Sequence, residues 1–230
     1  MNVCAIILAA GLGSRMKSDV TKQRMMLGNT SVIKRTVLAF DRCEKITGIV
    51  VVARAEEIDF MKAELSSIGK LVSVVIGGKS RAESAKLGFL SIPKDAELVA
   101  IHDGARALIT EEMISSVVAK AEITGAATAA SYVTDTVKCV DSSMRITGTM
   151  NRDSLMRAET PQVFDVKIYK DALEAIGEGL FTVTDDNMLV EKIGKDVYCV
   201  GLDGCNLKIT TPSDIDYAEF ILRKRGMLDV

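Results

Sequence analysis

Short, mostly continuous apolar runs alternate along this chain with segments of helical periodicity, and this alternation constrains the fold most. The runs lie at Val3–Ala9, Gly48–Val52, Leu71–Ile76, Leu98–Ile101, Ala127–Val133 and Val197–Val200. Continuous apolar runs are typical of strands that are covered on both faces, as in a parallel sheet. After the first run, Ile33, Val37 and Phe40 recur at the spacing of one helix face. We therefore predict an α/β fold, with a mostly parallel sheet flanked by helices.

One stretch interrupts the alternation. Residues from about 134 to 151 read TDTVKCVDSSMRITGTMN, which is polar and β-like and lacks an amphipathic helix. This pattern predicts a projecting hairpin, or arm, that turns near Asp141. Because no linker or repeat divides the rest, we predict a single domain over residues 1–230 that carries this arm.

Composition excludes several classes of protein. A net charge of −2 argues against a nucleic-acid partner. The apolar runs fall short of the roughly 18 residues that a membrane-spanning helix needs, so no membrane partner is expected. The five cysteines are scattered and contain no C-x-x-C pair, which disfavours a disulfide framework or a zinc site. We expect a protein of the cytoplasm.

The first predicted strand leads into a loop rich in small residues, LAAGLGSRM. Its four small residues would let backbone N–H groups approach an anion closely: Ala9, Ala10, Gly11 and Gly13. The dinucleotide motif G-x-G-x-x-G fails because Met16 stands at the third glycine, and a P-loop fails because no Gly-Lys-Ser/Thr follows. Four basic residues come after these small residues: Arg15, Lys17, Lys22 and Arg24. Their charges are suited to binding a triphosphate, although a solvated basic loop remains the alternative.

A second glycine loop, Gly77–Ser80, lies between a predicted strand and a predicted helix. It resembles the end of a P-loop, but Ser73 stands where the first glycine of that motif is required. We expect its backbone amides and Ser84 to contact a nucleotide without forming a P-loop.

Five sequence blocks, taken together, resemble one enzyme family. The blocks are AAGLGSRM with TKQRMMLG, then IHDGARALI, RDSLMRAETPQVF, TDDNMLVE and NLKITTPSDI. In this order they resemble the 2-C-methyl-D-erythritol 4-phosphate cytidylyltransferases of the non-mevalonate isoprenoid pathway, from Ala5 to about Leu222. The resemblance implies a Rossmann-like nucleotidyltransferase fold and a homodimer whose arms reach the partner's active site. It also implies attack by a sugar-alcohol phosphate on the α-phosphorus of CTP, with Mg²⁺ or another divalent metal assisting.

The resemblance implies roles for single residues on the nucleotide side. Arg15 and Lys22 match the basic pair that stabilises the transition state. The first loop, together with Gly78 and Ser84 of the cytosine-reading loop, matches the positions that bind CTP. Asp103 in HDGAR matches a position near the ribose and the metal, although capping of its own loop is the alternative for this residue.

On the acceptor side, Arg152 in NRDSL and Lys208 in NLKIT match residues that place the acceptor phosphate. Polar positions that match the lining of the acceptor site are Arg106, Thr136, Thr160 and Thr184. For His102, the only histidine, we expect packing or orientation, because a phosphate nucleophile needs no base. Asp185 and Asp186 also fit the start of a helix.

The sequence departs from the usual family pattern at four positions. Thr21 and Ala107 stand where proline is usual, Arg24 where an aromatic residue is common, and Lys79 where an acidic residue is common. Two alternatives stay open. Ribitol-5-phosphate cytidylyltransferases share the fold, although their loops more often read AGGxGxRM and HDAVRPF. A non-catalytic nucleotide-binding module is the other alternative.

Overall fold

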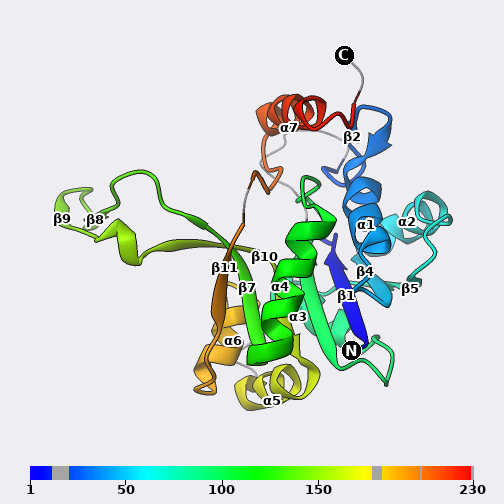
Figure 1. Ribbon diagram of the computed structural model, residues 1–230, viewed down its shortest axis with the longest axis horizontal. Coiled ribbons are helices and arrows are strands. Elements are labelled where there is room, and N and C mark those ends of the chain that lie inside the picture. Colours follow the sequence, from blue (N-terminus) through cyan, green and yellow to red (C-terminus); the bar gives the residue numbers. More distant parts are fainter. Residues whose placement is uncertain (12–20, 178–182, 203, 229–230) are drawn as a thin grey trace.

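The structure is a computed structural model that describes residues 1–11, 21–177, 183–202 and 204–228. Its main sheet has seven strands in the order β11-β7-β10-β6-β1-β4-β5. Their bounds are β1 Val3–Leu8, β4 Gly48–Ala53, β5 Leu71–Ile76, β6 Leu98–Asp103, β7 Ala126–Tyr132, β10 Met156–Asp165 and β11 Tyr198–Gly201. Neighbouring strands are parallel except at β10, which runs antiparallel to both β6 and β7. The predicted α/β class with a mostly parallel sheet is confirmed (Figure 1).

Six of the seven strands coincide with the apolar runs of the sequence. The seventh, β10, was not predicted as a strand. Its first half leads away from the arm and pairs with β7 without being buried, and its buried residues run from Thr160 to Phe164. A strand that is buried over half of its length lacks the continuous apolar run that marks the other strands.

Helices cover both faces of the sheet. They are α1 Val32–Arg42, α2 Ile58–Glu64, α3 Arg81–Phe89, α4 Glu111–Thr124, α5 Val166–Ile176, α6 Asp186–Lys192 and α7 Pro212–Lys224. Helices α1, α2 and α4 pack on one face, while α3, α5 and α6 pack on the other. Along β1, Ala5 and Ile7 belong to the first core, and Ile6 and Leu8 belong to the second. Both sets of side chains are buried, which explains why the strand is apolar at every position.

Local sequence signals start two of these helices. Asp185 caps α6, and its Oδ1 accepts a hydrogen bond from the backbone N–H of Met188 at 3.1 Å. Thr211 precedes α7, and its N–H donates to Oδ2 of Asp214 at 2.8 Å. Asp185 fits a helix start in the sequence and serves as one, because acceptors near the first turn satisfy the free N–H groups there.

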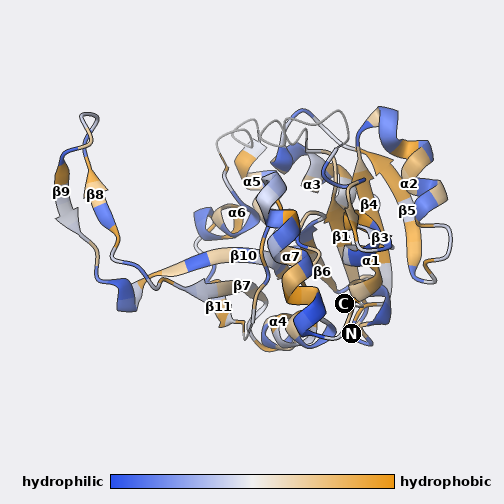
Figure 2. Ribbon diagram, turned by 90° about the horizontal axis from the view of Figure 1, so that it is seen from above, coloured by the Kyte–Doolittle hydropathy of each residue, from blue (hydrophilic) through white to orange (hydrophobic). Residues whose placement is uncertain are grey.

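The arm is an antiparallel hairpin of β8 (Lys138–Val140) and β9 (Ile146–Thr149) that stands clear of the body (Figures 1 and 2). At its turn, Oδ1 of Asp141 accepts hydrogen bonds from the backbone N–H groups of Ser143 and Arg145. The predicted projecting hairpin is therefore present, with its turn at the predicted place. A second small hairpin joins β2 (Met26–Leu27) to β3 (Thr30–Ser31). No helix in the described part of the chain is long and apolar enough to cross a membrane.

Candidate active site

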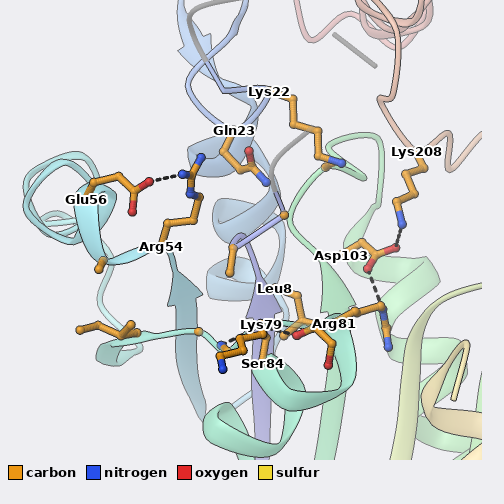
Figure 3. Close-up of a pocket in the computed structure, with 18 residues that line it drawn as sticks. Leu8, Lys22, Gln23, Arg54, Glu56, Lys79, Arg81, Ser84, Asp103 and Lys208 are labelled. Carbon is orange, nitrogen blue, oxygen red and sulfur yellow. Dashed lines mark hydrogen bonds and ion pairs between the residues drawn. The ribbon is translucent and has the colours of Figure 1, made fainter. Parts of the chain in front are cut away.

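A cavity of about 470 Å³ opens at the carboxyl ends of the central strands (Figure 3). It is lined by Leu8 at the end of β1, Arg54 after β4, Ile76 at the end of β5 and Asp103 at the end of β6. Ligands of open α/β sheets bind beyond this edge, because the loops that follow parallel strands meet there. The cavity therefore lies beside the two glycine loops, which the sequence predicts to follow strands of the sheet.

Two glycine-containing loops form one wall. Ala10 and Gly11 come from the first loop, and Gly77 and Gly78 come from the second. The loops touch so closely that a Cβ on Gly77 would lie 2.6 Å from Cβ of Ala10 and 2.9 Å from Oγ of Ser84. Glycine is required at this contact because any side chain would push the two loops apart.

The Ser84 hydroxyl holds the second loop in shape. It accepts a hydrogen bond from the N–H of Gly78 at 3.1 Å and donates to the carbonyl of Ser80 at 2.9 Å. Ser84 lines the cavity but uses its hydroxyl within the loop. Its direct effect is therefore to set the path of the backbone that faces a ligand.

Asp103 is the most strongly coordinated carboxylate in the cavity. Its Oδ2 lies 2.8 Å from Nζ of Lys208, and its Oδ1 accepts from Nε of Arg81 at 3.4 Å. Nε of Arg106 lies 3.7 Å from Oδ2. Burial on its own would raise the pKa of Asp103, but the charges of Arg81 and Lys208 outweigh it and hold that pKa below its ordinary value. Asp103 is therefore ionised at neutral pH and balances several cations.

His102 lies behind Asp103 and is fully buried. Burial, the main cause, lowers the pKa of His102 to about 3, so the ring is neutral at physiological pH. Its Nε2 lies 3.4 Å from the carbonyl of Arg106, and its Nδ1 lies 3.1 Å from Oγ1 of Thr160. A carbonyl only accepts, so Nε2 carries the proton and Nδ1 accepts from Thr160. Phe40 packs 4.9 Å away, between ring centres. The expected orienting role of His102 agrees with these contacts.

Positive charge dominates the described lining of the cavity. The charged side chains there are five cations and two carboxylates: Lys22, Arg54, Lys79, Arg81, Lys208, Glu56 and Asp103. Arg54 and Glu56 form an ion pair with each other. A cavity surrounded by cations attracts and binds polyphosphates.

The structure brings together most of the residues expected to bind the nucleotide. Lys22 and Lys208 line one cavity with Asp103, Gly78 and Ser84, and Figure 3 shows both lysines on the same side of it. The backbone N–H of Ala9 is bonded to the carbonyl of Val52 at 2.7 Å, which anchors the start of the first loop. Arg15 and Gly13 fall outside the described residues.

The residues expected on the acceptor side are spread more widely. Arg106 is part of the wall behind Asp103, where its Nη1 donates to the carbonyl of Asn206 at 2.7 Å. Thr160 accepts from the N–H of Asp103 at 3.0 Å. Thr184 is exposed just before α6. These three residues are not among those that line the described cavity.

Two acceptor-side residues lie on the arm. Arg152 opens the 3₁₀ turn η3 (Arg152–Ser154) at its base, and its Nη1 donates to the carbonyl of Thr134 at 3.1 Å. Thr136 is exposed beside it. Neither belongs to the described lining of the cavity within the same chain.

The departures from the family pattern make contacts of their own. Oγ1 of Thr21 donates to Oε1 of Glu57 at 2.5 Å, and the guanidinium of Arg24 lies 4.4 Å from the ring centre of Phe60. Both contacts join the segment that carries Lys22 to the turn η2 (Ala55–Glu57) and helix α2. Through these contacts Thr21 and Arg24 hold the segment around Lys22, at positions where the family usually has proline and an aromatic residue.

Several cavity residues were not predicted from the sequence. Arg54 and Glu56 follow directly on β4, so the rule that ligand loops follow parallel strands could have found them. Arg81 opens α3 directly after the second glycine loop, and its position there was a usable signal. By contrast, the local pattern marks Asp186 only as part of a helix start and does not indicate that it binds Arg81.

The donor set permits only one mode of metal binding. No group of three or more His, Cys, Asp or Glu side chains gathers within the described ranges of the chain. Asp103 does lie in the cavity beside the cations. Mg²⁺ commonly binds through one or two carboxylates together with substrate phosphates and water. The site therefore fits a metal carried by a triphosphate, with Asp103 as the protein ligand.

The fold and the cavity define the class of protein. A doubly wound sheet carries, at its carboxyl edge, two glycine loops and a cluster of cations around one carboxylate. This combination of glycine loops and positive charge at the carboxyl edge of the sheet is typical of α/β enzymes that act on nucleotides. The chain is therefore a nucleotide-handling α/β protein of the nucleotidyltransferase type.

Comparison with known proteins narrows the class to one family. The sequence profile described as 2-C-methyl-D-erythritol 4-phosphate cytidylyltransferase matches residues 3–224. A protein of that name from Desulforamulus reducens is 40% identical, with 98% of this chain and 97% of the relative covered. One from Caldanaerobacter subterraneus is 39% identical, with 97% and 100% covered. The crystal structure of 4-diphosphocytidyl-2C-methyl-D-erythritol synthase from Anaerococcus prevotii has a TM-score of 0.85 and 32% identity, with 96% of each chain covered. This chain belongs to the 2-C-methyl-D-erythritol 4-phosphate cytidylyltransferase family.

Proposed function

We propose that this chain transfers the cytidylyl group of CTP to 2-C-methyl-D-erythritol 4-phosphate, with release of pyrophosphate, in the synthesis of isoprenoid precursors. The observation that carries the proposal is the shared cavity of Lys22, Lys208 and Asp103 beside two glycine loops. Membership of the family supports the choice of both substrates.

The chemistry requires positioning and charge more than a base. An oxygen of the acceptor phosphate forms a bond to the α-phosphorus of CTP, while the bond from that phosphorus to the bridging oxygen breaks. Pyrophosphate leaves with the electron pair. The nucleophile is already ionised, so no proton has to be removed. Such reactions depend on alignment and on charge stabilisation of the transition state.

The cavity supplies these two requirements on the nucleotide side. The loops at Gly11 and Gly78 leave room for phosphate oxygens to approach the backbone. Lys22, which lines the same cavity, would offset negative charge that develops at the α-phosphorus and on the leaving group. Arg15 is proposed as its companion, because the matching family motif pairs these two residues.

The acceptor would bind between Lys208 and the arm of a second copy of this chain. Lys208 contributes the ammonium group within the cavity. Arg152 and Thr136 are exposed on an arm that extends away from its own body (Figure 1), so they are available to a neighbouring subunit. Thr160 and Arg106 would position Asp103 from behind, and Thr184 would act at the edge of the site. We therefore propose a homodimer in which each arm completes the other cavity.

A divalent metal, proposed as Mg²⁺, would enter with the triphosphate and be held by Asp103. When bound, it would neutralise phosphate charge and orient the departing pyrophosphate. We place the enzyme in the cytoplasm, in keeping with five cysteines that are all free.

The test is a matrix of four nucleoside triphosphates against two acceptors, 2-C-methyl-D-erythritol 4-phosphate and ribitol 5-phosphate, read as pyrophosphate release. We expect the fastest release with CTP and the methylerythritol phosphate. Faster release with ribitol 5-phosphate would replace the acceptor assignment. Failure to release pyrophosphate in any combination would favour a nucleotide-binding module without catalytic activity.

A further inference from the structure

A line of polar side chains runs from the protein core to the cavity. The hydroxyl of Tyr169, on α5, donates to Oδ1 of Asp186 at 2.7 Å. Nη1 of Arg81 donates to Oδ2 of the same carboxylate at 2.6 Å, and Nε of Arg81 donates to Asp103 at 3.4 Å. Asp103 in turn binds Lys208 at 2.8 Å. Arg81 thus connects a core carboxylate with the carboxylate that contacts the lysine of the cavity.

The inner end of this line is held from several sides. Asp186 and Tyr169 are both fully buried. The ring of Tyr169 packs against Phe89 and Phe164, with ring centres 5.1 Å and 5.4 Å away. The backbone N–H of Asp186 donates to Oε1 of Gln162 at 2.9 Å. Because α5, β10 and α6 all contribute, the carboxylate of Asp186 has little freedom to move.

Two members of this line, Tyr169 and Arg81, act as hydrogen-bond donors. Burial, followed by the charge of Asp186, raises the pKa of Tyr169, so the phenol stays protonated and donates. The guanidinium of Arg81 is charged at every working pH. Its planar fork contacts two carboxylates with two different nitrogens, which the single ammonium group of a lysine cannot reproduce.

The fork decides how Asp103 is presented to the cavity. Arg81 binds Oδ1, which leaves Oδ2 directed at Lys208. Thr160 is a second anchor, because its Oγ1 accepts a hydrogen bond from the backbone N–H of Asp103. Without Arg81, the carboxylate could rotate, and Lys208 would lose its fixed partner. Figure 3 shows Arg81 below Asp103 and Lys208 above it.

We propose that Arg81 is a positioning residue, which Asp186 and Tyr169 hold in place so that Asp103 fixes the ammonium group of Lys208 for the acceptor. This inference rests on the proposed function and adds three residues that act through Lys208. The competing explanation is that Arg81 and Asp186 form a buried ion pair that serves stability alone.

The two explanations differ in the kinetic parameter that changes. If Arg81 acts through Lys208, Arg81→Lys should lower kcat and raise the KM for the acceptor while the KM for CTP stays close to wild type. We expect a fall of about 30-fold in kcat/KM for the acceptor, since small displacements of a positioning group cost one to two orders of magnitude. Tyr169→Phe removes one hydroxyl from the far end of the line and should cost about threefold.

Leu173→Ala is the matched control. Leu173 lies on α5 with Tyr169 and belongs to the same apolar core, but it makes no polar contact in the line. It should lower the melting temperature at least as much as Tyr169→Phe and leave kcat and both KM values unchanged. This control separates loss of stability from loss of positioning.

The decisive measurement is a double-mutant cycle between Arg81→Lys and Lys208→Ala, read as pyrophosphate release with the methylerythritol phosphate. We expect Arg81→Lys to cost little once Lys208 is absent, because its effect acts through that lysine. Equal losses in both backgrounds, or variants that lose only melting temperature, would overturn the inference. If Arg81→Lys fails to fold, the same cycle with Tyr169→Phe decides. An inactive wild-type protein would overturn the proposed function itself, which distinguishes the two failures.

Discussion

The wall of the cavity around Asp103 and the arm at β8–β9 are built in opposite ways. Around Asp103, buried charges are matched within one chain, so that Arg81, Arg106 and Lys208 all lie near carboxylates. On the arm, apolar side chains face outward: Val140 is 45% exposed, Met144 76% and Ile146 60%. Exposed apolar side chains on a projecting hairpin indicate a surface that another molecule covers.

This difference separates a cavity wall that one chain organises by itself from an arm that leaves apolar surface exposed. The cavity wall is preorganised, because moving any of its charges would leave a buried partner uncompensated. The arm keeps apolar side chains exposed beyond the turn at Asp141, and in the homodimer proposed above a second copy would cover them. Perturbing the two regions should therefore produce different kinds of effect.

The largest effect is expected within the cavity. Lys22→Ala and Lys208→Ala should each lower kcat by roughly 10²–10³-fold, because each removes a preorganised charge near the transferred group. Steady-state pyrophosphate release measures this loss. The matched control is Lys62→Ala on the exposed side of α2, which should leave kcat unchanged. A loss of tenfold or less for Lys22→Ala would mean that it does not act in the site.

A smaller and more selective effect is expected on the arm. Arg152→Ala should raise the KM for the acceptor by about tenfold, and the KM for CTP far less, because it removes one charged hydrogen-bond donor to the acceptor phosphate. The control is Arg145→Ala, which removes an arginine from the same arm that is already paired with Asp141. Equal changes in both KM values would contradict the assignment.

Mixing variants then tests which subunit each residue serves. When Lys22→Ala and Arg152→Ala chains are refolded together, half of the dimers should be hybrids with one intact cavity. At an acceptor concentration well below the wild-type KM, where Arg152→Ala alone is about tenfold slower, activity should recover to about a quarter of wild type at equal mixing. Activity that stays at the average of the two parents would place Arg152 in the cavity of its own subunit.

The smallest effect concerns folding stability and comes from His102, which lies buried behind the cavity wall. The pKa of His102 is lowered from 6.5 to about 3 by burial, so between these values the unfolded chain binds a proton that the folded chain excludes. Folding stability should therefore fall as the pH drops below about 6.5, with a slope approaching 1.4 kcal/mol per pH unit. Urea unfolding of wild type and His102→Gln between about pH 6 and pH 4.5 measures this slope. The range is chosen because most carboxylates titrate below it. A slope that His102→Gln retains would show that other groups cause it.

Much of the fold could be predicted because the signals are local. The central strands are mostly apolar, since helices cover both faces of the sheet. The glycine loops, the caps at Asp185 and Thr211 and the arm between residues 134 and 151 are marked by residues that lie next to each other in sequence. Only β10 among the main strands was missed, because Pro161 and the polar residues before it hide its buried half.

Which charges meet was decided by tertiary structure alone. The sequence contains 29 basic and 31 acidic residues, and the electrostatic attraction of any opposite pair is the same until the fold sets their distance. Arg81 reaches Asp186 across 105 positions of the chain, and this contact exists because α3 and α6 cover the same face of the sheet. The sequence alone therefore determined the layers and the loops that face a nucleotide. The packing of those layers determined which buried carboxylate holds which cation, because that choice depends on distances between segments that no local pattern encodes.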